Sequence, residues 1–202
     1  MNTELYQLTK KDVEKSAEVI SKAFLEYSMF QNILGDQLNE DNIKLVLKFM
    51  IKQAILYGKA YAISKDMEAI ILYSDFKNYK VGFIGSLRAG LLSLMKIGTE
   101  AGKRFTVYDN YSLRTHKESI NESHYYVILL GTDPNKQGQG YGTKLMNHLF
   151  EEAKEKAKPC YLETHGSKNV EFYKKLGFRI ISKGCVPGTD ILQYGMLRDA
   201  DM

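Results

Sequence analysis

The chain has 202 residues, of which 44% are hydrophobic and 26% are charged, and its 28 basic and 24 acidic side chains give a formal net charge of +4. This length allows a sizeable core, and we expect residues 1–202 to form a single domain. The basic excess is mild and its residues are scattered, which excludes the basic stripe typical of a nucleic-acid-binding protein.

Hydrophobic periodicity predicts an alternation of strands and helices along the whole chain. The elements expected in chain order are a strand at 4–8, a helix that Thr9 caps and that runs to about Leu25, a helix at 40–57, a hairpin of 60–63 and 69–73, helices over 83–117 with breaks near Gly98 and Gly102, a strand at 125–132, a helix at 140–156, a strand opened by Pro159, a helix at 167–176, and strands at 178–182 and 191–197.

An apolar stretch at 81–98 is the candidate membrane segment of the chain. Arg88 near its centre and Lys96 argue against a span, so we expect an amphipathic helix there and no membrane-spanning segment. Cys160 and Cys185 form no disulfide framework, and the N-terminal residues have no apolar signal core. A reducing cytoplasm is the setting that these features predict.

A glycine-rich segment, DPNKQGQGYGTKL, follows an apolar run and opens a helical pattern. Gly138, Gly140 and Gly142 stand at alternate positions, so successive backbone N–H groups are open to close approach. The following helix adds its own unpaired N–H groups and the positive end of its dipole. The segment predicts a turn that holds a pyrophosphate, with a plain surface turn as the alternative.

Three known glycine patterns compete for this turn. A Walker A loop fails, because neither Ser nor Thr follows Lys144. A dinucleotide fingerprint lacks its third Gly, since Thr143 stands there, although Glu163 lies near the position of its ribose-binding acid. The third pattern is Q/R-x-x-G-x-G/A at the start of a helix, which Gln137, Gly140 and Gly142 match.

A second segment, CYLETHGSKNVEFYKKLGFRIIS, begins at Cys160. An apolar strand that carries Glu163 leads to a polar turn and then to a short helix with Asn169 and Tyr173. Gly177 is well placed to end that helix as its C′ residue.

Together the two segments resemble the GNAT acyltransferase superfamily. In that family a Q/R-x-x-G-x-G/A loop holds the pyrophosphate of coenzyme A, and a strand ending in L-E-T precedes N-x-x-[FL]-Y-x-x-x-G-F. The run from His124 to Tyr126 also resembles the start of the fourth strand in puromycin acetyltransferase-like members. The resemblance covers about 124–182. It implies an α/β fold of the α+β type, with a mixed, largely antiparallel sheet of six to seven strands, flanking helices, and strands four and five splayed apart.

The resemblance further implies that acetyl-CoA lies in the opening between strands four and five. Its pantetheine amides would pair with free backbone of strand four, as an added strand does. Gly131 suits a β-bulge or a close backbone approach, with a tight bend at the strand end as the alternative. No metal is expected. The residues expected to hold the cofactor are Leu130, Gly131, Thr132, Gln137, Gly138, Gln139, Gly140, Tyr141, Gly142, Thr143, Asn169, Phe172 and Tyr173.

Acetylation of an amine requires a neutral amine and protonation of the departing thiolate. An alkylamine with a pKa near 10.4 is neutral in about one part in a thousand at pH 7.4, which costs about 4 kcal/mol and favours a base. A Tyr and a thiol differ by about 1.5 pKa units, so a Tyr suits hydrogen bonding and partial proton donation. Tyr173 matches the general-acid Tyr of the family, with Asn169 on the same helix face. Its alternative is a packing role.

The base is less defined by the sequence. Many family members have an acidic residue on strand four, where this chain has Tyr126. Glu163 on strand five is the acidic candidate, acting directly or through water, with a structural carboxylate as the alternative. His165 and His124 have suitable ordinary pKa values but occupy turn and strand-start positions. A backbone N–H near Gly131 or Thr132 is the expected oxyanion donor.

The acceptor pocket is expected in the divergent first half of the chain. Glu26 can attract a cationic amine, and Tyr27 and Phe30 can form an apolar wall, with ordinary helix-end packing as the alternative. The expected protein is an N-acetyltransferase, monomeric or homodimeric, that acts on a primary amine of a small molecule by direct attack in a ternary complex. The alternatives are an acyl-CoA-binding regulatory protein with little catalysis and a dinucleotide-binding protein.

Overall fold

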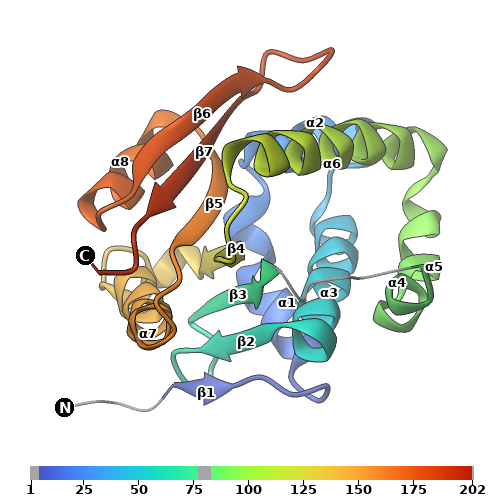
Figure 1. Cartoon of the computed structure of the whole chain (residues 1–202). Helices are drawn as coiled ribbons and strands as arrows, with labels where there is room; N and C mark the ends of the chain where they lie inside the picture. The colour runs from blue at the N-terminus through green and yellow to red at the C-terminus, as the bar shows by residue number, and fades with distance from the viewer. Residues whose placement is uncertain (1–4, 77–82, 202) are drawn as a thin grey trace.

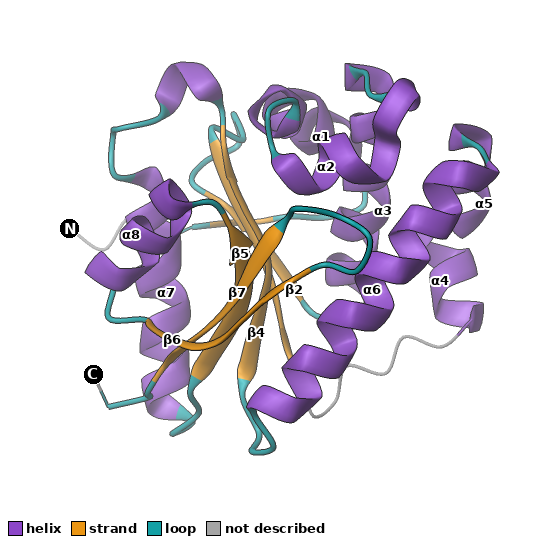
Figure 2. Ribbon diagram, turned by 90° about the horizontal axis from the view of Figure 1, so that it is seen from above, coloured by secondary structure: helices purple, strands orange, loops and turns teal. Residues whose placement is uncertain are grey.

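The computed structural model describes residues 5–76 and 83–201, which form one sheet with helices on both faces (Figures 1 and 2). The strands are β1 (Tyr6–Gln7), β2 (Lys59–Ala62), β3 (Ala69–Asp75), β4 (Tyr125–Thr132), β5 (Cys160–His165), β6 (Arg179–Cys185) and β7 (Leu192–Arg198). The α-helices are α1 (Val13–Ser21), α2 (Ser28–Leu34), α3 (Glu40–Tyr57), α4 (Phe83–Ala89), α5 (Leu91–Leu94), α6 (Thr99–Ser119), α7 (Tyr141–Glu155) and α8 (Ser167–Lys175).

The seven strands lie in the order β1-β2-β3-β4-β5-β7-β6. All neighbouring pairs are antiparallel except β4 and β5, which are parallel. The helix α7 provides the crossover that two parallel strands require. The expected mixed, largely antiparallel sheet is confirmed.

Each face of the sheet carries its own hydrophobic core. In Figure 2, α7 and α8 lie on one side of the strands, and α1, α2, α3 and α6 lie on the other. On β3, Ile70 and Leu72 face the α1–α3 side, which we call the first core, whereas Ile71 and Tyr73 face the α7 side, the second core. Side chains alternate between faces along a strand, so a strand with helices on both sides is apolar throughout. Full burial of each such aliphatic side chain contributes about 1.5–3 kcal/mol to folding.

The first helix begins later than the sequence pattern suggested. The Asp12 carboxylate accepts hydrogen bonds from the Thr9 backbone N–H at 2.8 Å and the Thr9 hydroxyl at 2.7 Å. This contact holds a turn, and α1 starts after it at Val13. The helix ends at Ser21 and continues as a 3₁₀ turn. Residue 4, at the start of the first expected strand, lies outside the described residues.

Within the connection between β3 and β4, residues 83–119 form the helices α4, α5 and α6 with a 3₁₀ turn before α6. α6 lies along the sheet face that α1 and α2 also cover (Figures 1 and 2). The backbone breaks at Gly90 and Gly98, which have φ values of 105° and 108°. Gly102 lies inside α6, so the break expected there is wrong. Residues 81 and 82 of the apolar stretch lie outside the described part. Among the described helices, none combines the length and the apolar character needed to cross a bilayer.

Candidate active site

β4 and β5 pair over three positions and then separate. The pairs are Tyr125 with Cys160, Tyr126 with Tyr161, and Val127 with Leu162. Beyond them β4 continues to Thr132 beside β3, and β5 continues to His165 beside β7. In the described chain, the edge of β4 that faces β5 from 128 to 132 therefore has no strand partner, and its backbone groups are available to a ligand.

A β-bulge lies at the point of separation. Leu72 pairs with Leu129 and Tyr73 pairs with Val127, which leaves Ile128 as an extra residue in β4. Ile128 and Leu129 consequently both pack against the first core. Bulges re-aim side chains and backbone groups beside active sites. The sequence indicated Gly131 as a possible bulge in this strand, whereas the extra residue is Ile128.

Gly131 is explained by packing against the first core. A Cβ at this position would lie 3.1 Å from Phe24 Cε2 and 3.4 Å from Ile20 Cδ1. β4 continues through this position, because Gly131 and Thr132 still pair with β3. The absence of a side chain at Gly131 therefore lets the ring of Phe24 pack closely against this face of β4.

The glycine-rich turn leads directly into α7. Gly138 and Gly140 have φ values of 77° and 78°, which a residue with a Cβ rarely adopts, and the space around both is open. Gly140 is the N-cap and gives no side-chain cap, and the Lys144 N–H bonds its carbonyl at 3.0 Å. The backbone N–H groups in the first turn of α7 have no carbonyl acceptor within the helix. They present the uncapped, positive end of a helix to an anion.

Gly142 allows α8 to approach the start of α7. A Cβ on Gly142 would lie 3.3 Å from Phe172 Cζ. Two of the residues expected at the cofactor are therefore in contact with each other. Asn169, also on α8, donates from Nδ2 to the His165 carbonyl at 3.1 Å, which ties the helix to the end of β5.

Glu163 is a buried carboxylate that faces α6. Its side chain is 4% exposed, and burial raises its pKa to about 7, although the Tyr126 and Tyr161 hydroxyls partly oppose this. Glu163 Oε1 has no hydrogen-bond partner among the described residues. His116 Nδ1 of α6 lies 3.8 Å from Oε1. The sequence identified Glu163 and Tyr126, and the structure brings them together.

The histidines near Glu163 are weak bases. Burial lowers the pKa of His165 to about 4 and that of His116 to about 3, and it also lowers the pKa of His124. The Tyr27 hydroxyl lies 2.8 Å from His165 Nδ1. A general base works best with a pKa near the working pH, which favours the carboxylate of Glu163 over these imidazoles.

Tyr173 lies on the other face of the sheet. Its ring packs against the second core, edge-on to Phe172 and Phe178 with centroids 5.1 and 5.7 Å away. Burial raises the pKa of its hydroxyl, so it stays protonated and can donate a hydrogen bond. Glu163 and Tyr173 thus stand on opposite faces of the sheet, beside the strands that separate.

The three expected acceptor residues are placed differently from one another. Tyr27 is half-buried beside His165, and burial raises its pKa to about 12. Glu26 is exposed. Phe30 is 1% exposed and packs against Phe24 in the first core, with ring centroids 5.2 Å apart. Of the three, Tyr27 alone has a described contact with the residues around Glu163.

The sequence did not predict that α6 places side chains beside Glu163 and His165. Tyr108 lies 3.5 Å from His165 Nε2, Ser112 donates to Gln193 at 3.0 Å, and His116 faces Glu163. A weak signal exists, because His116 is one of the few buried positions on an otherwise polar helix. Nothing in its spacing from Glu163 indicates the contact.

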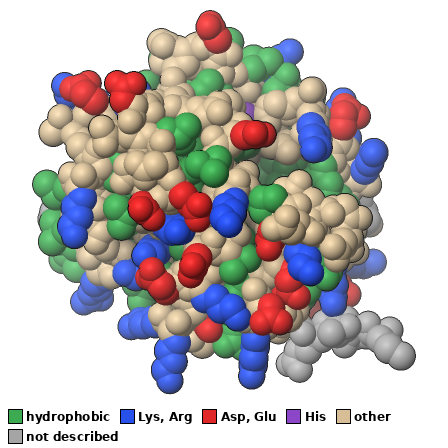
Figure 3. Space-filling model, turned by 180° about the vertical axis from the view of Figure 1, so that it is seen from behind, with side chains coloured by type: hydrophobic (Ala, Val, Ile, Leu, Met, Phe, Trp, Pro, Cys, Tyr) green, Lys and Arg blue, Asp and Glu red, His purple; other side chains and the backbone are tan. Residues whose placement is uncertain are grey.

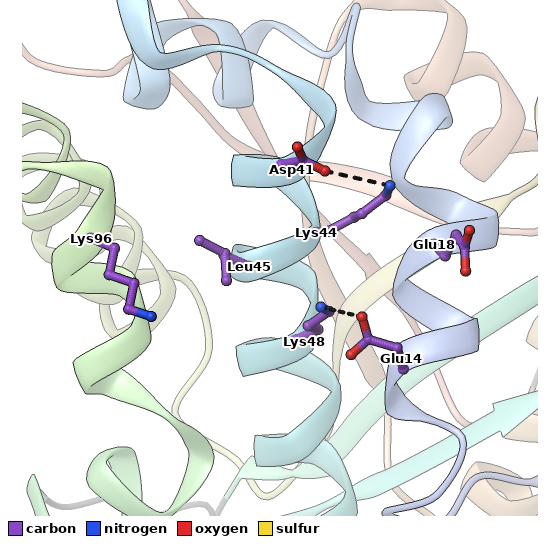
Figure 4. Close-up of a pocket in the computed structure, with 7 residues that line it drawn as sticks. All are labelled: Glu14, Glu18, Asp41, Lys44, Leu45, Lys48 and Lys96. Atoms are coloured by element: carbon purple, nitrogen blue, oxygen red, sulfur yellow. Dashed lines mark hydrogen bonds and ion pairs between the residues drawn. The ribbon is translucent and has the colours of Figure 1, made fainter.

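The surface of the described chain also has two hollows. One, of about 430 Å³, lies between α1, α3 and the turn after α5 (Figure 4), and its charged groups include the pairs Lys44–Asp41 and Lys48–Glu14. The other, of about 360 Å³, lies between α6 and β6. Basic and acidic side chains are interspersed on the face seen in Figure 3. No metal-binding cluster of His, Cys, Asp or Glu occurs in the described part of the chain.

Comparison with known proteins gives a family match over part of the chain. Residues 104–180 match the acetyltransferase (GNAT) domain family. An uncharacterized N-acetyltransferase of Schizosaccharomyces pombe is 26% identical over 178 residues, which cover 83% of this chain and 71% of that protein.

Solved structures share the fold over the whole chain. A Corynebacterium glutamicum structure described as histone acetyltransferase HPA2 and related acetyltransferase has a TM-score of 0.67 at 18% identity, covering 100% of this chain and 98% of that one. The C-terminal condensation domain of Ebony, solved with beta-alanyl-dopamine, has a TM-score of 0.69 at 8% identity, covering 97% and 98%. An N-acetyltransferase from Staphylococcus aureus Mu50 has a TM-score of 0.62 at 15% identity, covering 96% and 99%.

Residues 104–180 thus carry the acetyltransferase (GNAT) domain match, and together with the N-acetyltransferase relative and the shared fold this supports an acetyltransferase. GNAT acetyltransferases in general use acetyl-CoA. The dinucleotide fingerprint belongs to an open, mostly parallel sheet, whereas this sheet has a single parallel pair among its described strands.

Proposed function

We propose that this protein transfers the acetyl group of acetyl-CoA to a primary amine of a small molecule by direct attack in a ternary complex. The observation that carries the proposal is the gap between β4 and β5, with Glu163 on one face of the sheet and Tyr173 on the other. A base and a proton donor on opposite sides of one opening match the two proton transfers that amine acetylation requires.

The residues around the gap fit acetyl-CoA. The free edge of β4, including Leu130, Gly131 and Thr132, offers backbone groups to the pantetheine amides. The turn from Gln137 to Thr143 offers the uncapped N-terminus of α7 to the pyrophosphate. Bound acetyl-CoA supplies the activated acetyl thioester.

Glu163 is proposed as the base that takes a proton from the incoming ammonium group. Its pKa of about 7 leaves part of the population ionised at neutral pH, and the carboxylate is ready to accept a proton there. Tyr126, whose hydroxyl lowers the pKa of that carboxylate, is proposed to hold it in place.

Tyr173 is proposed as the hydrogen-bond donor to the departing thiolate. Its raised pKa makes complete proton transfer costly, so partial donation fits better. Backbone N–H groups at the bulge and along 129–132 of β4 are proposed as donors to the developing oxyanion.

The acceptor amine is proposed to approach from the side of the sheet that α2 and α6 cover. Tyr27 and Tyr108 both reach His165 there, on the same face as Glu163. Their aromatic rings and the nearby carboxylate suit a cationic amine. We further propose that residues 1–202 act as one domain. A cytoplasmic location is also proposed, since both described cysteines are free thiols.

A panel of primary amines with isotope-labelled acetyl-CoA tests this proposal. Product should be detected by mass spectrometry, because Cys185 is an exposed thiol that would react with thiol-trapping reagents. Acetylated amine is the expected result. Tight acetyl-CoA binding without acetylation of any amine would instead support the regulatory acyl-CoA-binding alternative.

A further inference from the structure

Two buried histidines form a hydrogen-bonded pair whose tautomers follow from the geometry. His124 Nδ1 lies 2.7 Å from the backbone carbonyl of Glu122, and a carbonyl can only accept, so this nitrogen carries a hydrogen. Neutral imidazole has one N–H, which leaves His124 Nε2 as an acceptor. His116 Nε2 lies 2.7 Å from it and must donate. His116 Nδ1 is therefore left with a lone pair.

Aromatic packing holds this pair in place. The Phe76 ring packs against both imidazoles, tilted against His116 with centroids 4.0 Å apart and stacked on His124 with centroids 5.0 Å apart. Tyr161 stacks on the other side of His116 at 4.2 Å. Burial lowers the pKa of both histidines, which favours their neutral forms.

The lone pair of His116 Nδ1 faces Glu163 Oε1 at 3.8 Å, and that oxygen has no hydrogen-bond partner in the described chain. An ionised carboxylate and a lone pair repel each other, which matches a separation longer than a hydrogen bond. A protonated carboxyl group, in contrast, could donate to that nitrogen. The arrangement favours the form of Glu163 that holds a proton.

We propose that His116 is a positioning residue: its Nδ1, kept as an acceptor by His124 and the Glu122 carbonyl, receives the hydrogen bond of the Glu163 carboxyl group once Glu163 has taken the amine proton. This inference rests on the proposed role of Glu163 as base. The N–H bond of the ammonium group breaks, its electron pair stays on nitrogen, and an O–H bond forms on Glu163. No proton moves to His116, and the proton leaves Glu163 for solvent after product release.

Other charged and titratable groups surround the two ends of this arrangement. The charges of Asp75, Glu122 and Lys158 influence the pKa of His124. The hydroxyls of Tyr126 and Tyr161 lower the pKa of Glu163, and the charge of Asp109 on α6 raises it. Each of these is a separate influence that a test must leave intact.

The variant His116→Phe keeps a ring between Phe76 and Tyr161 but removes the acceptor nitrogen. The acid limb of the kcat/KM profile should then move to lower pH, by on the order of one pH unit, because the protonated form of Glu163 loses its partner. His148→Phe is the matched control, since His148 lies on α7 against Tyr61 and away from Glu163. An unmoved acid limb in a folded His116→Phe protein would overturn the proposal.

Glu163→Gln separates this inference from the proposed function. If Glu163→Gln keeps the wild-type acid limb, Glu163 is not the base and both ideas fall. If Glu163→Gln removes the limb but His116→Phe leaves it in place, only the role of His116 is wrong.

Nitrogen-15 NMR of the histidine rings gives a second test. It uses the wild-type protein, so its result does not depend on the folding of a variant. The chain has only four histidines, so their ring signals can be assigned. His116 Nδ1 should appear as an unprotonated nitrogen and His124 Nδ1 as a protonated one at neutral pH. A protonated His116 Nδ1 under these conditions would refute the proposal.

Discussion

Val127 of β4 and Leu162 of β5 form the last pair that joins these two strands before they separate. The extra residue of the β4 bulge, Ile128, follows Val127, and Glu163 follows Leu162. The buried carboxylate therefore belongs to the first residue of β5 after its backbone pairing with β4 stops. An acetyl donor that completes the edge of β4 would place its reactive end near this position.

The glycine-rich turn gives the first prediction. Gly140→Val should weaken acetyl-CoA binding at least tenfold, because the added side chain would occupy the open space at the N-terminus of α7. Calorimetric titration with acetyl-CoA measures the affinity.

The positive φ of Gly140 requires a matched control for that substitution. Gly188 has a φ of 75° and open surroundings in the turn between β6 and β7, so Gly188→Val imposes the same backbone strain elsewhere. Equal losses of affinity in both variants, or no loss in a folded Gly140→Val protein, would contradict the pyrophosphate assignment.

The second prediction concerns Glu163 as a base. Because its pKa is about 7, the wild-type kcat/KM should rise with pH through that value as the carboxylate ionises. Glu163→Gln should flatten this rise while acetyl-CoA affinity stays within about twofold, since its side chain faces α6 rather than the glycine-rich turn. Steady-state rates from pH 5.5 to 9 provide the test. A wild-type profile in the variant would assign the base to another group.

A third prediction is that Glu163→Gln stabilises the fold at high pH. The folded pKa of about 7 lies above the ordinary value of 4.5. Below pH 4.5 both states are protonated, and as pH rises toward 7 and beyond, the unfolded chain ionises first. Native stability is thereby lost, by on the order of 3 kcal/mol at pH 8.

Urea unfolding measures this effect. The Gln variant should exceed the wild type in free energy of unfolding at pH 8, and the difference should shrink at pH 5. Glu151→Gln, on the exposed face of α7, is the control and should show no such trend. A Glu163→Gln protein that is less stable than wild type at pH 8 would mean that the carboxylate is a structural partner.

The fourth prediction concerns Tyr173. Tyr173→Phe keeps the ring packing against Phe172 and Phe178 but removes the hydroxyl, so acetyl-CoA should still bind. Turnover should fall roughly ten- to a thousandfold, the scale of losing one positioned proton donor. Single-turnover rates isolate the chemical step.

The loss in Tyr173→Phe should be smaller with an acyl donor whose thiol has a lower pKa, because that leaving group needs less help. Full single-turnover activity with acetyl-CoA would leave Tyr173 as a packing residue.

The sequence predicted the second half of the fold closely. The expected strand at 125–132 is β4, and the helix expected at 140–156 is α7 at Tyr141–Glu155. Glycine spacing and strand periodicity are local signals, so they can be read without tertiary information. The start of α1 was placed too early, because the sidechain of Asp12, rather than that of Thr9, accepts the hydrogen bonds at the turn.

The surroundings of Glu163 could not be predicted in the same way. His116 lies 47 positions before Glu163 in the sequence, and its contact depends on how α6 packs across the sheet. The bulge at Ile128 depends on the register between β3 and β4, which a single strand does not reveal. Both features arise from pairing and packing between distant segments.

The most direct test of the central claim is a single-turnover experiment with carbon-13 acetyl-CoA, an amine that the panel identifies, and enzyme in excess. Quenched samples analysed by mass spectrometry should show labelled acetyl amine at the rate of acetyl-CoA loss, with no labelled protein at any time. Glu163→Gln should bind acetyl-CoA but form product far more slowly at pH 7. Labelled protein that forms and decays on the pathway, or an unchanged rate in Glu163→Gln, would contradict direct attack assisted by Glu163.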